Sequence, residues 1–475
     1  MKIHFNPKDF LRQFKIAASI APVRDVKPVL CNVKIVADKR NGVVLMATDT
    51  EVGIRCRVDA DVSANGEALL PPKQFRQILE SAKDERLTLA STNNGILITG
   101  KSDGNEQWGL DTQSPDEFPD VAEFAETAYH EIPATALSEM IRRTIFAVDS
   151  EDIRYALGGV CFEHVSSSLT AVATDGRRLA AQDADGIRVN GHEFEPAIVP
   201  VNALKLLTKV LKEKSVGDTD NVKMAVLAVV DDKRRTSGTV HFHCGDATVF
   251  SRLVEGRFPK WRAIMPETDG RLHACVRSET LRTALNRMVT TKSEPGVLFT
   301  FRRGNLTLES RAKESGQSKA AIPVAFNDTA EFIFDVNFIR EYLRSLDAET
   351  AVDIYMPMGN DPVLFEIGDG NYRYVVMPMI RDKPAGANVN AESEIADPEA
   401  DTGIEVVGQD SMMEEPMKKT DALPHPDDDT DLQTRFFQLQ MENDQLQAKV
   451  EHYKILLDRA MRVVEKMKND QRVCA

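Results

Sequence analysis

The strongest constraint on the fold is a unit of about 125 residues that occurs three times along the 475-residue chain. Each copy opens with an amphipathic helix candidate, at Pro7, Thr135 and Ser278. Apolar residues four positions apart put one pair on a single face of each helix. The pairs are Phe10 and Phe14, Leu137 and Ile141, and Leu281 and Leu285. The chain is therefore predicted to form three consecutive, similar domains.

A second helix candidate recurs deeper in each unit. It follows an apolar strand end and a proline or aspartate, in LLPPKQFRQILES, IVPVNALKLLTKVL and IFDVNFIREYLRSL. Phe75, Leu204 and Ile339 occupy matching positions roughly 130 residues apart. Short alternating runs with turn residues between them indicate antiparallel hairpins. We predict an α+β fold with two helices and antiparallel sheets per domain, in domains of residues 1–127, 128–270 and 271–381.

The last domain ends on a strongly apolar strand, RYVVMPMIR at residues 373–381. Pro378 interrupts it, because proline cannot donate a hydrogen bond within a sheet and belongs at a strand's edge or end. Residues 382–430 are rich in Asp, Glu, Pro, Ala and Asn, which predicts a flexible linker. Residues 431–470 carry about five heptads with Asn443 at a core position, which predicts a coiled coil and favours a parallel dimer. A solitary amphipathic helix is the alternative.

Charge is unevenly distributed along the chain. The net charge is -15, and about 21 acidic and 11 basic residues follow Arg381, so most of the acidity belongs to the tail. Each of the six helix candidates of the body has more basic than acidic side chains. Each alone is consistent with an ordinary solvated face, but together they indicate a positive surface suited to a phosphate backbone.

The sequence argues against several other classes of protein. The six cysteines form no CxxC pair, and neither a signal peptide nor an apolar run long enough to cross a membrane is evident, which predicts a cytoplasmic protein without cofactor or metal. Common nucleotide-binding and hydrolase motifs are absent. The Thr174–Gly176 segment predicts a tight turn rather than a catalytic aspartate. His241, His243 and Cys244 lack a fourth ligand at metal spacing, and Lys292 and Ser293 lack a partner base. We expect no enzymatic activity.

Four motifs, in order and at these spacings, resemble the bacterial sliding clamp family, the beta subunits of DNA polymerase III. They are IRYALGGV (153–160), AVATDGRRLA (171–180), EGRFPKW (255–261) and YRYVVMPM (372–379). The resemblance covers residues 1 to about 381 and says nothing about the tail. It implies a head-to-tail homodimeric ring of three domains per chain, with helices facing an encircled DNA duplex and sheets outside. It also implies a nucleoid-associated processivity factor that does not recognise base sequence.

The resemblance further implies an apolar groove for short peptides from partner proteins. These partners would be the alpha subunit of DNA polymerase III and other polymerases, the clamp loader and repair proteins. The matching groove positions are Leu157, Thr174, Gly176, Arg178, Leu179, Pro259, Ile264, Phe338, Val363, Val375, Val376, Met377, Pro378 and Met379. Valine and methionine side chains suit an adaptable apolar floor. Without the resemblance, a buried core strand would be the simpler interpretation of the last five.

Positions near DNA carry over less completely. Arg24, Lys73, Arg154 and Tyr155 match the family. The second-unit helix begins with Val201 and Asn202 where the family often has basic residues, and Lys205 follows one turn later.

Two functions fit these observations. The first is a clamp that encircles DNA. The second is a scaffold that uses the same body and groove, is recruited through its coiled coil and never encircles DNA. The basic helices and ring closure discriminate between them.

Overall fold

The computed structural model describes residues 1–379 with short gaps. The gaps are residues 93–94, 101–105, 150–155, 166–167, 192–193, 214–216, 218–219, 231–235, 289, 291–294, 313–315, 360 and 369. The predicted linker at 382–430, the predicted coiled coil at 431–470, and Lys292 and Ser293 lie outside the described part of the chain.

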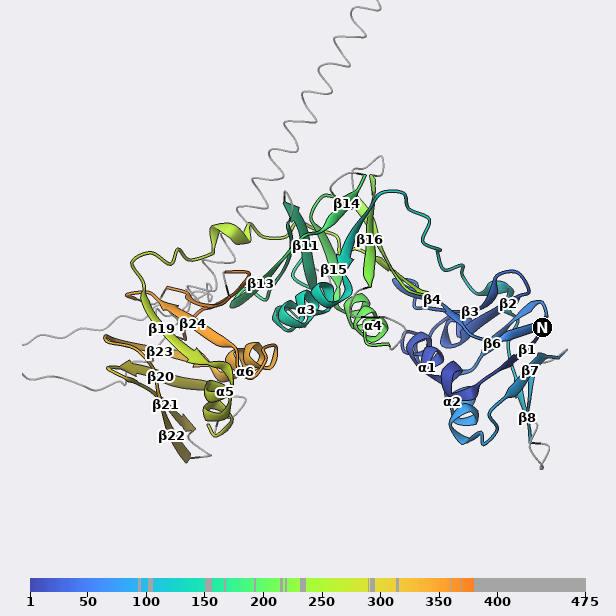
Figure 1. Cartoon of the computed structure of the whole chain (residues 1–475), viewed down its shortest axis with the longest axis horizontal. Coiled ribbons are helices and arrows are strands. Elements are labelled where there is room, and N and C mark those ends of the chain that lie inside the picture. The colour runs from blue at the N-terminus through green and yellow to red at the C-terminus, as the bar shows by residue number, and fades with distance from the viewer. Residues whose placement is uncertain are drawn as a thin grey trace, which may run out of the picture.

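The chain forms three units arranged in an arc, with the helices along its concave side and the sheets toward its convex side (Figure 1). Within the described residues each unit contributes two α-helices. These are α1 (Pro7–Ala18) and α2 (Pro72–Ser81), α3 (Ala134–Thr144) and α4 (Val201–Leu211), and α5 (Ser278–Asn286) and α6 (Val336–Arg344). Short 3-10 helices are η1 (Pro28–Cys31), η2 (Pro115–Glu117), η3 (Ile145–Ala147) and η4 (Trp261–Ala263). No described helix combines the length and apolarity needed to span a membrane.

The strands of each unit fall into two groups. The first strand group contains the strand that opens the unit. Its members are β1 (Lys2–Phe5), β5 (Asp61–Ala64), β7 (Leu87–Ser91), β8 (Gly95–Gly100) and β9 (Gln107–Asp111) in unit 1; β10 (Tyr129–Pro133), β14 (Arg188–Asn190), β16 (Asn221–Val230), β17 (Thr236–Cys244) and β18 (Ala247–Arg252) in unit 2; and β19 (Leu272–Arg277), β24 (Ala351–Met356), β25 (Val363–Ile367) and β26 (Tyr372–Val376) in unit 3.

The second strand group begins after the first helix of each unit. Its members are β2 (Val33–Asp38), β3 (Gly42–Thr48), β4 (Val52–Val58) and β6 (Gly66–Leu70) in unit 1; β11 (Gly159–Val165), β12 (Ser168–Thr174), β13 (Arg178–Asp185) and β15 (Ala197–Pro200) in unit 2; and β20 (Gly296–Arg302), β21 (Asn305–Ala312), β22 (Gly316–Pro323) and β23 (Thr329–Asp335) in unit 3. The three units therefore repeat one arrangement, as the sequence predicts. The domain boundaries at 127 and 270 stay predictions, and β10 and β19 begin shortly after them.

Sheets run continuously from one unit into the next. The second group of unit 1 joins the first group of unit 2 through β4 and β18, giving the order β14-β10-β16-β17-β18-β4-β3-β2-β6. The second group of unit 2 joins the first group of unit 3 through β13 and β26, giving β15-β11-β12-β13-β26-β25-β24-β19. Both junction pairs are antiparallel. Units 1 and 3 each have one equivalent strand that is not used in a junction. These strands, β9 in unit 1 and β22 in unit 3, are sheet edges.

The helices pack as their apolar spacing predicts. Phe75, Leu204 and Ile339 are each 0% exposed, and all six residues of the predicted i, i+4 pairs are buried. The first helix begins at Pro7 because the Asn6 side chain accepts hydrogen bonds from the next backbone N–H groups, the nearer at 2.9 Å, and proline fits the first helical turn.

The repeated ATD segments form the same turn in units 1 and 2. Thr48 and Thr174 donate their hydroxyls to the carbonyl four residues later, at 2.8 and 2.6 Å. Asp49 and Asp175 each accept two backbone N–H groups, those two and three residues on. The residue after each aspartate has a positive φ, and it is glycine in the second turn. The Thr174–Gly176 segment is thus a tight turn, as predicted.

A connecting strap lies beside each junction. The first strap, residues 112–128, places Glu126 2.7 Å from His241 of β17, and Phe124 stacks on His243 at 5.4 Å. Burial lowers the pKa of His241, although the facing carboxylate opposes this shift. The second strap, residues 253–271, buries Trp261 to 1% exposure, and its indole N–H donates to Glu163 at 3.1 Å.

We predict that Leu204→Ala destabilises unit 2, because it leaves a cavity beneath α4. The expected loss is about 2–5 kcal/mol of unfolding free energy. Native-state hydrogen exchange of the α4 amides measures it. Lys205→Ala, at the exposed neighbouring position, is the control, and equal protection in the two variants would contradict the packing described.

Candidate functional site

The turn after β12 holds Arg178 at the junction of units 2 and 3. The side chain of Asp175 accepts the backbone N–H of Arg178 at 3.0 Å and its Nε–H at 2.8 Å. Gly176, with φ of 85°, allows the turn to close so tightly. Arg178 is consequently fixed at both its backbone and its side chain.

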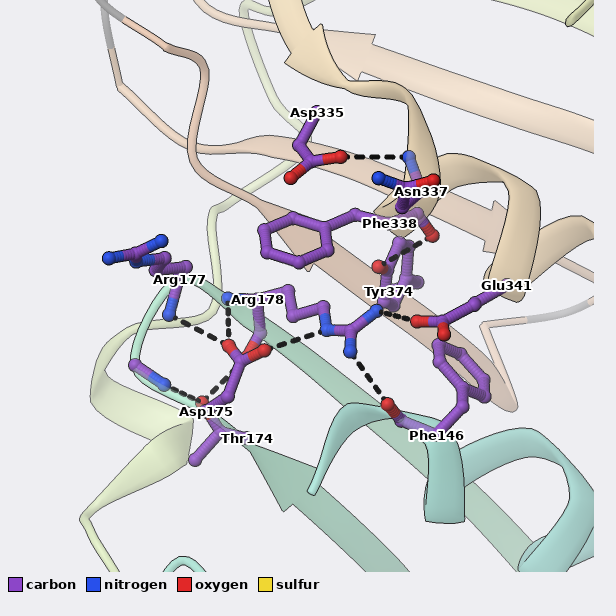
Figure 2. Close-up of polar contacts among 11 residues, drawn as sticks. Phe146, Thr174, Asp175, Arg177, Arg178, Asp335, Asn337, Phe338, Glu341 and Tyr374 are labelled. Carbon is purple, nitrogen blue, oxygen red and sulfur yellow. Dashed lines mark hydrogen bonds and ion pairs between the residues drawn. The ribbon is translucent and has the colours of Figure 1, made fainter. Parts of the chain in front are cut away.

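All three nitrogens of the Arg178 guanidinium are engaged, and one of them connects unit 2 to unit 3 (Figure 2). Beyond the Asp175 contact, Nη1 donates to Glu341 of α6 at 2.5 Å, and Nη2 donates to the carbonyl of Phe146 at 2.7 Å. The guanidinium carbon also lies 4.3 Å from the ring centre of Phe338, a cation–π distance. The side chain is only 8% exposed. Desolvation alone would lower the pKa of Arg178, but interactions with Tyr374, Asp175 and Glu341 outweigh desolvation and raise the pKa.

Three buried tyrosines support this network from the core. The rings of Tyr342 and Tyr374 stack at 4.6 Å with an interplanar angle of 6°. The Tyr374 hydroxyl donates to the carbonyl of Phe338 at 3.0 Å, and the Tyr372 hydroxyl donates to the carbonyl of Arg143 at 2.7 Å. Burial raises the pKa of all three phenols, so they remain neutral, and Tyr372 and Tyr374 act as donors. The backbone of α6 at Phe338 is thereby connected to β26.

The segment after β26 lies between the two units. Met377 donates its backbone N–H to the carbonyl of Arg177 at 3.0 Å, and Met379 donates to the carbonyl of Ile333 at 2.7 Å. Pro378, which has no N–H to donate, falls between these two hydrogen bonds. Met379 is 39% exposed, which is unusual for a large apolar side chain among the described residues. The strand therefore ends at the surface, between β13 and β23.

The predicted groove residues divide between two faces of the sheet. Leu179 and Val375 lie in an outer apolar cluster with Trp261, whose neighbours Pro259 and Ile264 are half-buried. Val363 and Val376 belong to the helix-side core and are both 0% exposed, so they support a groove only from beneath. Thr174 and Arg178 are buried in the turn and junction. The groove residues with accessible surface are Leu157, Gly176, Pro259, Ile264, Phe338, Met377, Pro378 and Met379.

The concave helices carry both paired and free basic side chains. Several are neutralised by neighbours: Lys15 and Arg76 share Glu80 at 2.8 and 2.9 Å, and Arg143 contacts Glu139 at 2.6 Å. Arg143 is also 12% exposed, so it belongs to the junction rather than to the concave surface. The exposed ones without an ion pair in the described part of the chain are Lys8, Lys73, Lys83, Lys205, Lys209, Lys212, Arg287 and Arg344.

The predicted DNA-facing positions are only partly described. Lys73 on α2 and Lys205 on α4 are exposed, and Arg24 is exposed in the loop after α1, between the exposed Val23 and Val26. Arg154 and Tyr155 lie outside the described residues. A hollow between α1 and α2 is lined by Lys15, Lys73 and Arg76.

The alternative metal and catalytic candidates have structural partners. His243 contacts the Thr248 hydroxyl at 3.0 Å, and His241 contacts Glu126 as described. Among the described residues, no cluster of three or more His, Cys, Asp or Glu side chains could hold a metal ion. Burial raises the pKa of the Cys56 thiol to about 12, which makes it a poor nucleophile at neutral pH.

Sequence reasoning missed Glu341, Phe146 and Asp335 as parts of this site. Glu341 is 163 residues from Arg178, and nothing local in the sequence pairs them. Asp335 had a signal, because an aspartate directly before a helix is an N-cap candidate. Its carboxylate accepts the backbone N–H of Asn337 at 2.8 Å, and burial raises its pKa.

Comparisons with known proteins agree over the body of the chain. The family model of the DNA polymerase III beta subunit N-terminal domain matches residues 1–122, and that of its central domain matches residues 131–260. The chain is similar to the beta sliding clamp of Pseudomonas putida, at 26% identity over 373 residues, covering 78% of this chain and 97% of the relative. The beta sliding clamp of Synechocystis is 28% identical over 406 residues, covering 80% and 99%.

Solved structures show the same similarity. A DNA polymerase III subunit beta sliding clamp from Pseudomonas aeruginosa, bound to griselimycin, superposes with a TM-score of 0.70 at 25% identity, covering 80% of this chain and 100% of the other. The DNA polymerase III beta subunit of Thermotoga maritima, at 22% identity, has a TM-score of 0.69 over 80% of this chain and 100% of the other, and shares the fold.

We predict that Arg178→Met weakens the junction of units 2 and 3, because it leaves Asp175 and Glu341 without their shared cation. Removing one partner of a buried ion pair costs about 3–5 kcal/mol. Hydrogen exchange of the β26 amides should accelerate strongly. Arg177→Met, at the exposed neighbouring position, is the matched control. Unchanged β26 protection in the Arg178 variant would show that backbone pairing alone holds the junction.

Proposed function

Because this chain belongs to the DNA polymerase III beta subunit family and is a DNA sliding clamp, we propose that two copies close head to tail into a ring around duplex DNA. The observation that carries this proposal is the repeated strand arrangement. Each junction within the chain joins the same two kinds of edge strand. One strand of each kind, β22 and β9, has an outer edge that pairs with no other described strand.

Edge strands expose backbone donors and acceptors that favour pairing with another strand. β4 pairs with β18 and β13 pairs with β26 in antiparallel register. By the same rule β22 of one copy would pair with β9 of a second copy. Head-to-tail pairing of this kind gives a ring when the rotation between copies closes and a filament when it does not. We propose that two copies close the ring through two such pairings.

The concave helices support DNA as the encircled ligand. These helices lie on the side of the arc that a ring would turn inward (Figure 1), and the lysines and arginines named above are exposed. Such contacts are electrostatic, screened by salt and independent of base sequence. A closed ring does not require tight binding, because it is retained by topology, and weak contacts permit sliding. Lys73, Lys205, Arg24, Arg154 and Tyr155 are the proposed DNA-facing residues.

The segment Met377–Met379 and its surroundings support peptide binding. Both units contribute half-buried side chains to the predicted groove, Leu157, Pro259 and Ile264 before β19 and Phe338 on α6. Apolar anchors of an extended peptide suit such a surface. We propose that the groove recruits the DNA polymerase III alpha subunit, other polymerases, the clamp loader and repair proteins. The clamp itself would catalyse no reaction and work in the cytoplasm on the nucleoid.

We also propose a role for the tail, about which the family resemblance says nothing. Residues 431–470 would form a coiled coil joined to the body by a linker of about fifty residues, which spans roughly 40 Å root mean square. That reach allows pairing between the two copies of a ring or with another replication protein. The scaffold alternative keeps the groove and the coiled coil but does not encircle DNA.

We predict that the protein, loaded onto nicked circular plasmid by a clamp loader with ATP, stays on the circle through gel filtration and is lost when the plasmid is linearised. Topological retention is the reason. Linear DNA with both ends blocked by bound protein is the control and should restore retention. Equal retention on circular and unblocked linear DNA would indicate ordinary binding. Failure on both with a competent loader would favour the scaffold.

We also predict that the full chain and a chain ending at residue 381 both sediment at twice their monomer mass, 52.8 kDa for the full chain. The physical reason is that edge-strand pairing lies wholly within the body. A dimeric full chain with a monomeric truncated chain would assign dimerisation to the tail. Cross-linking of the isolated tail to a dimer would separately support the coiled coil, whereas a monomer at high micromolar concentration would exclude self-pairing.

A further inference from the structure

The charged groups around the Met377–Met379 segment differ in how many partners they have. The Arg178 guanidinium donates hydrogen bonds to Asp175, Glu341 and the Phe146 carbonyl. Each of its three nitrogens is therefore already engaged, and the side chain is nearly buried. Two further charged groups near the Met377–Met379 segment are Arg177 and Asp335.

Asp335 is a half-buried carboxylate at the end of β23. One oxygen, Oδ1, caps α6 by accepting the Asn337 N–H at 2.8 Å. The Asn337 side chain also hydrogen-bonds to this carboxylate. Arg178 is close enough to oppose the burial that raises the pKa of Asp335, but it makes no ion pair with this carboxylate. Asp335 thus presents a half-buried carboxylate without an ion-pair partner among the described residues, beside the Phe338 ring (Figure 2).

Arg177 is the complementary group on unit 2. Its backbone is held by Asp175, at 3.0 Å, while its side chain is exposed. Within the described part of the chain its guanidinium has no ion-pair partner, and in Figure 2 it is directed away from the Arg178 network. A free guanidinium of this kind suits a carboxylate.

Met377 lies between these two groups. It is paired on one side with Arg177, through the 3.0 Å backbone hydrogen bond. On the other side, the antiparallel bridge of Met379 with Ile333 brings Asp335 opposite Met377. Two strand spacings separate Arg177 from Asp335, on the order of 10 Å. An extended peptide covers that distance in about three residues.

We propose that the groove selects a short extended peptide whose two apolar anchors are flanked by opposite charges, an acidic side chain toward Arg177 and a cationic side chain toward Asp335. This inference rests on the proposed groove and specifies its partner. The apolar anchors would lie over Phe338 and the Met377–Met379 segment. The flanking charges would fix which way the peptide runs across the groove, since reversal would oppose like charges.

The test uses the full chain and six-residue peptides with a central leucine–phenylalanine pair. The flanking residues are glutamate and lysine in either order, two glutamates, two lysines, or two glutamines. Fluorescence anisotropy measures Kd at low and high salt. One of the two mixed-charge orders should bind about fivefold more tightly than the glutamine peptide, and high salt should reduce this advantage.

Substitutions assign each preference to its residue. Asp335→Asn keeps an oxygen to cap α6 but removes the charge, so it should abolish the advantage that lysine gives. Arg177→Gln should abolish the advantage that glutamate gives. Asp328→Asn and Arg188→Gln, at exposed positions with no ion pair in the described structure, are matched controls and should change neither preference.

The outcomes separate this inference from the proposed function. Equal, measurable binding of the mixed-charge and glutamine peptides would overturn charge selection while leaving the groove intact. A charge preference that survives Asp335→Asn and Arg177→Gln would overturn the assignment to these residues. If no peptide binds, including the glutamine peptide, the groove itself is wrong and the inference fails with it.

Discussion

The whole body depends on pairing between edge strands. A sheet edge leaves backbone N–H and C=O groups without partners, and each unit taken alone would have such edges at both ends. The chain removes them at two junctions by joining β4 to β18 and β13 to β26. At the second junction this backbone pairing is reinforced by side chains, because Arg178 reaches from β13 to Glu341 on α6. The curvature of the arc and the alignment of six helices on one side follow from these two continuous sheets (Figure 1).

Periodic sequence features predicted local structure well. Phe75, Leu204 and Ile339 recur at one position of a repeated helix, and each is fully buried. The Thr174–Gly176 turn was predictable because Asp-Gly sequences favour tight turns. These features depend on contacts close in sequence, where spacing and residue type carry the information.

Features that depend on distant contacts were not predictable from local patterns. The strand order across units joins β13 to β26, nearly two hundred residues away along the chain, and no periodicity encodes that choice. The separation of Val375 from Val376 onto opposite faces follows from strand alternation, but which face holds the helices depends on the fold. The family resemblance supplied the groove as a set of positions. The structure separates those with accessible surface from those beneath, and adds Asp335 and Glu341.

The two connecting straps have a mechanical consequence. Each junction within the chain is covered by a covalent segment, with Glu126 against His241 at the first and Trp261 against Glu163 at the second. A junction between β9 and β22 of separate copies would have no covalent connection, and none of the described residues forms such a strap beside either strand. Of the three kinds of seam in the proposed ring, that one offers the least resistance to separation. It would therefore act as the gate through which DNA enters, while the junctions within each chain stay closed.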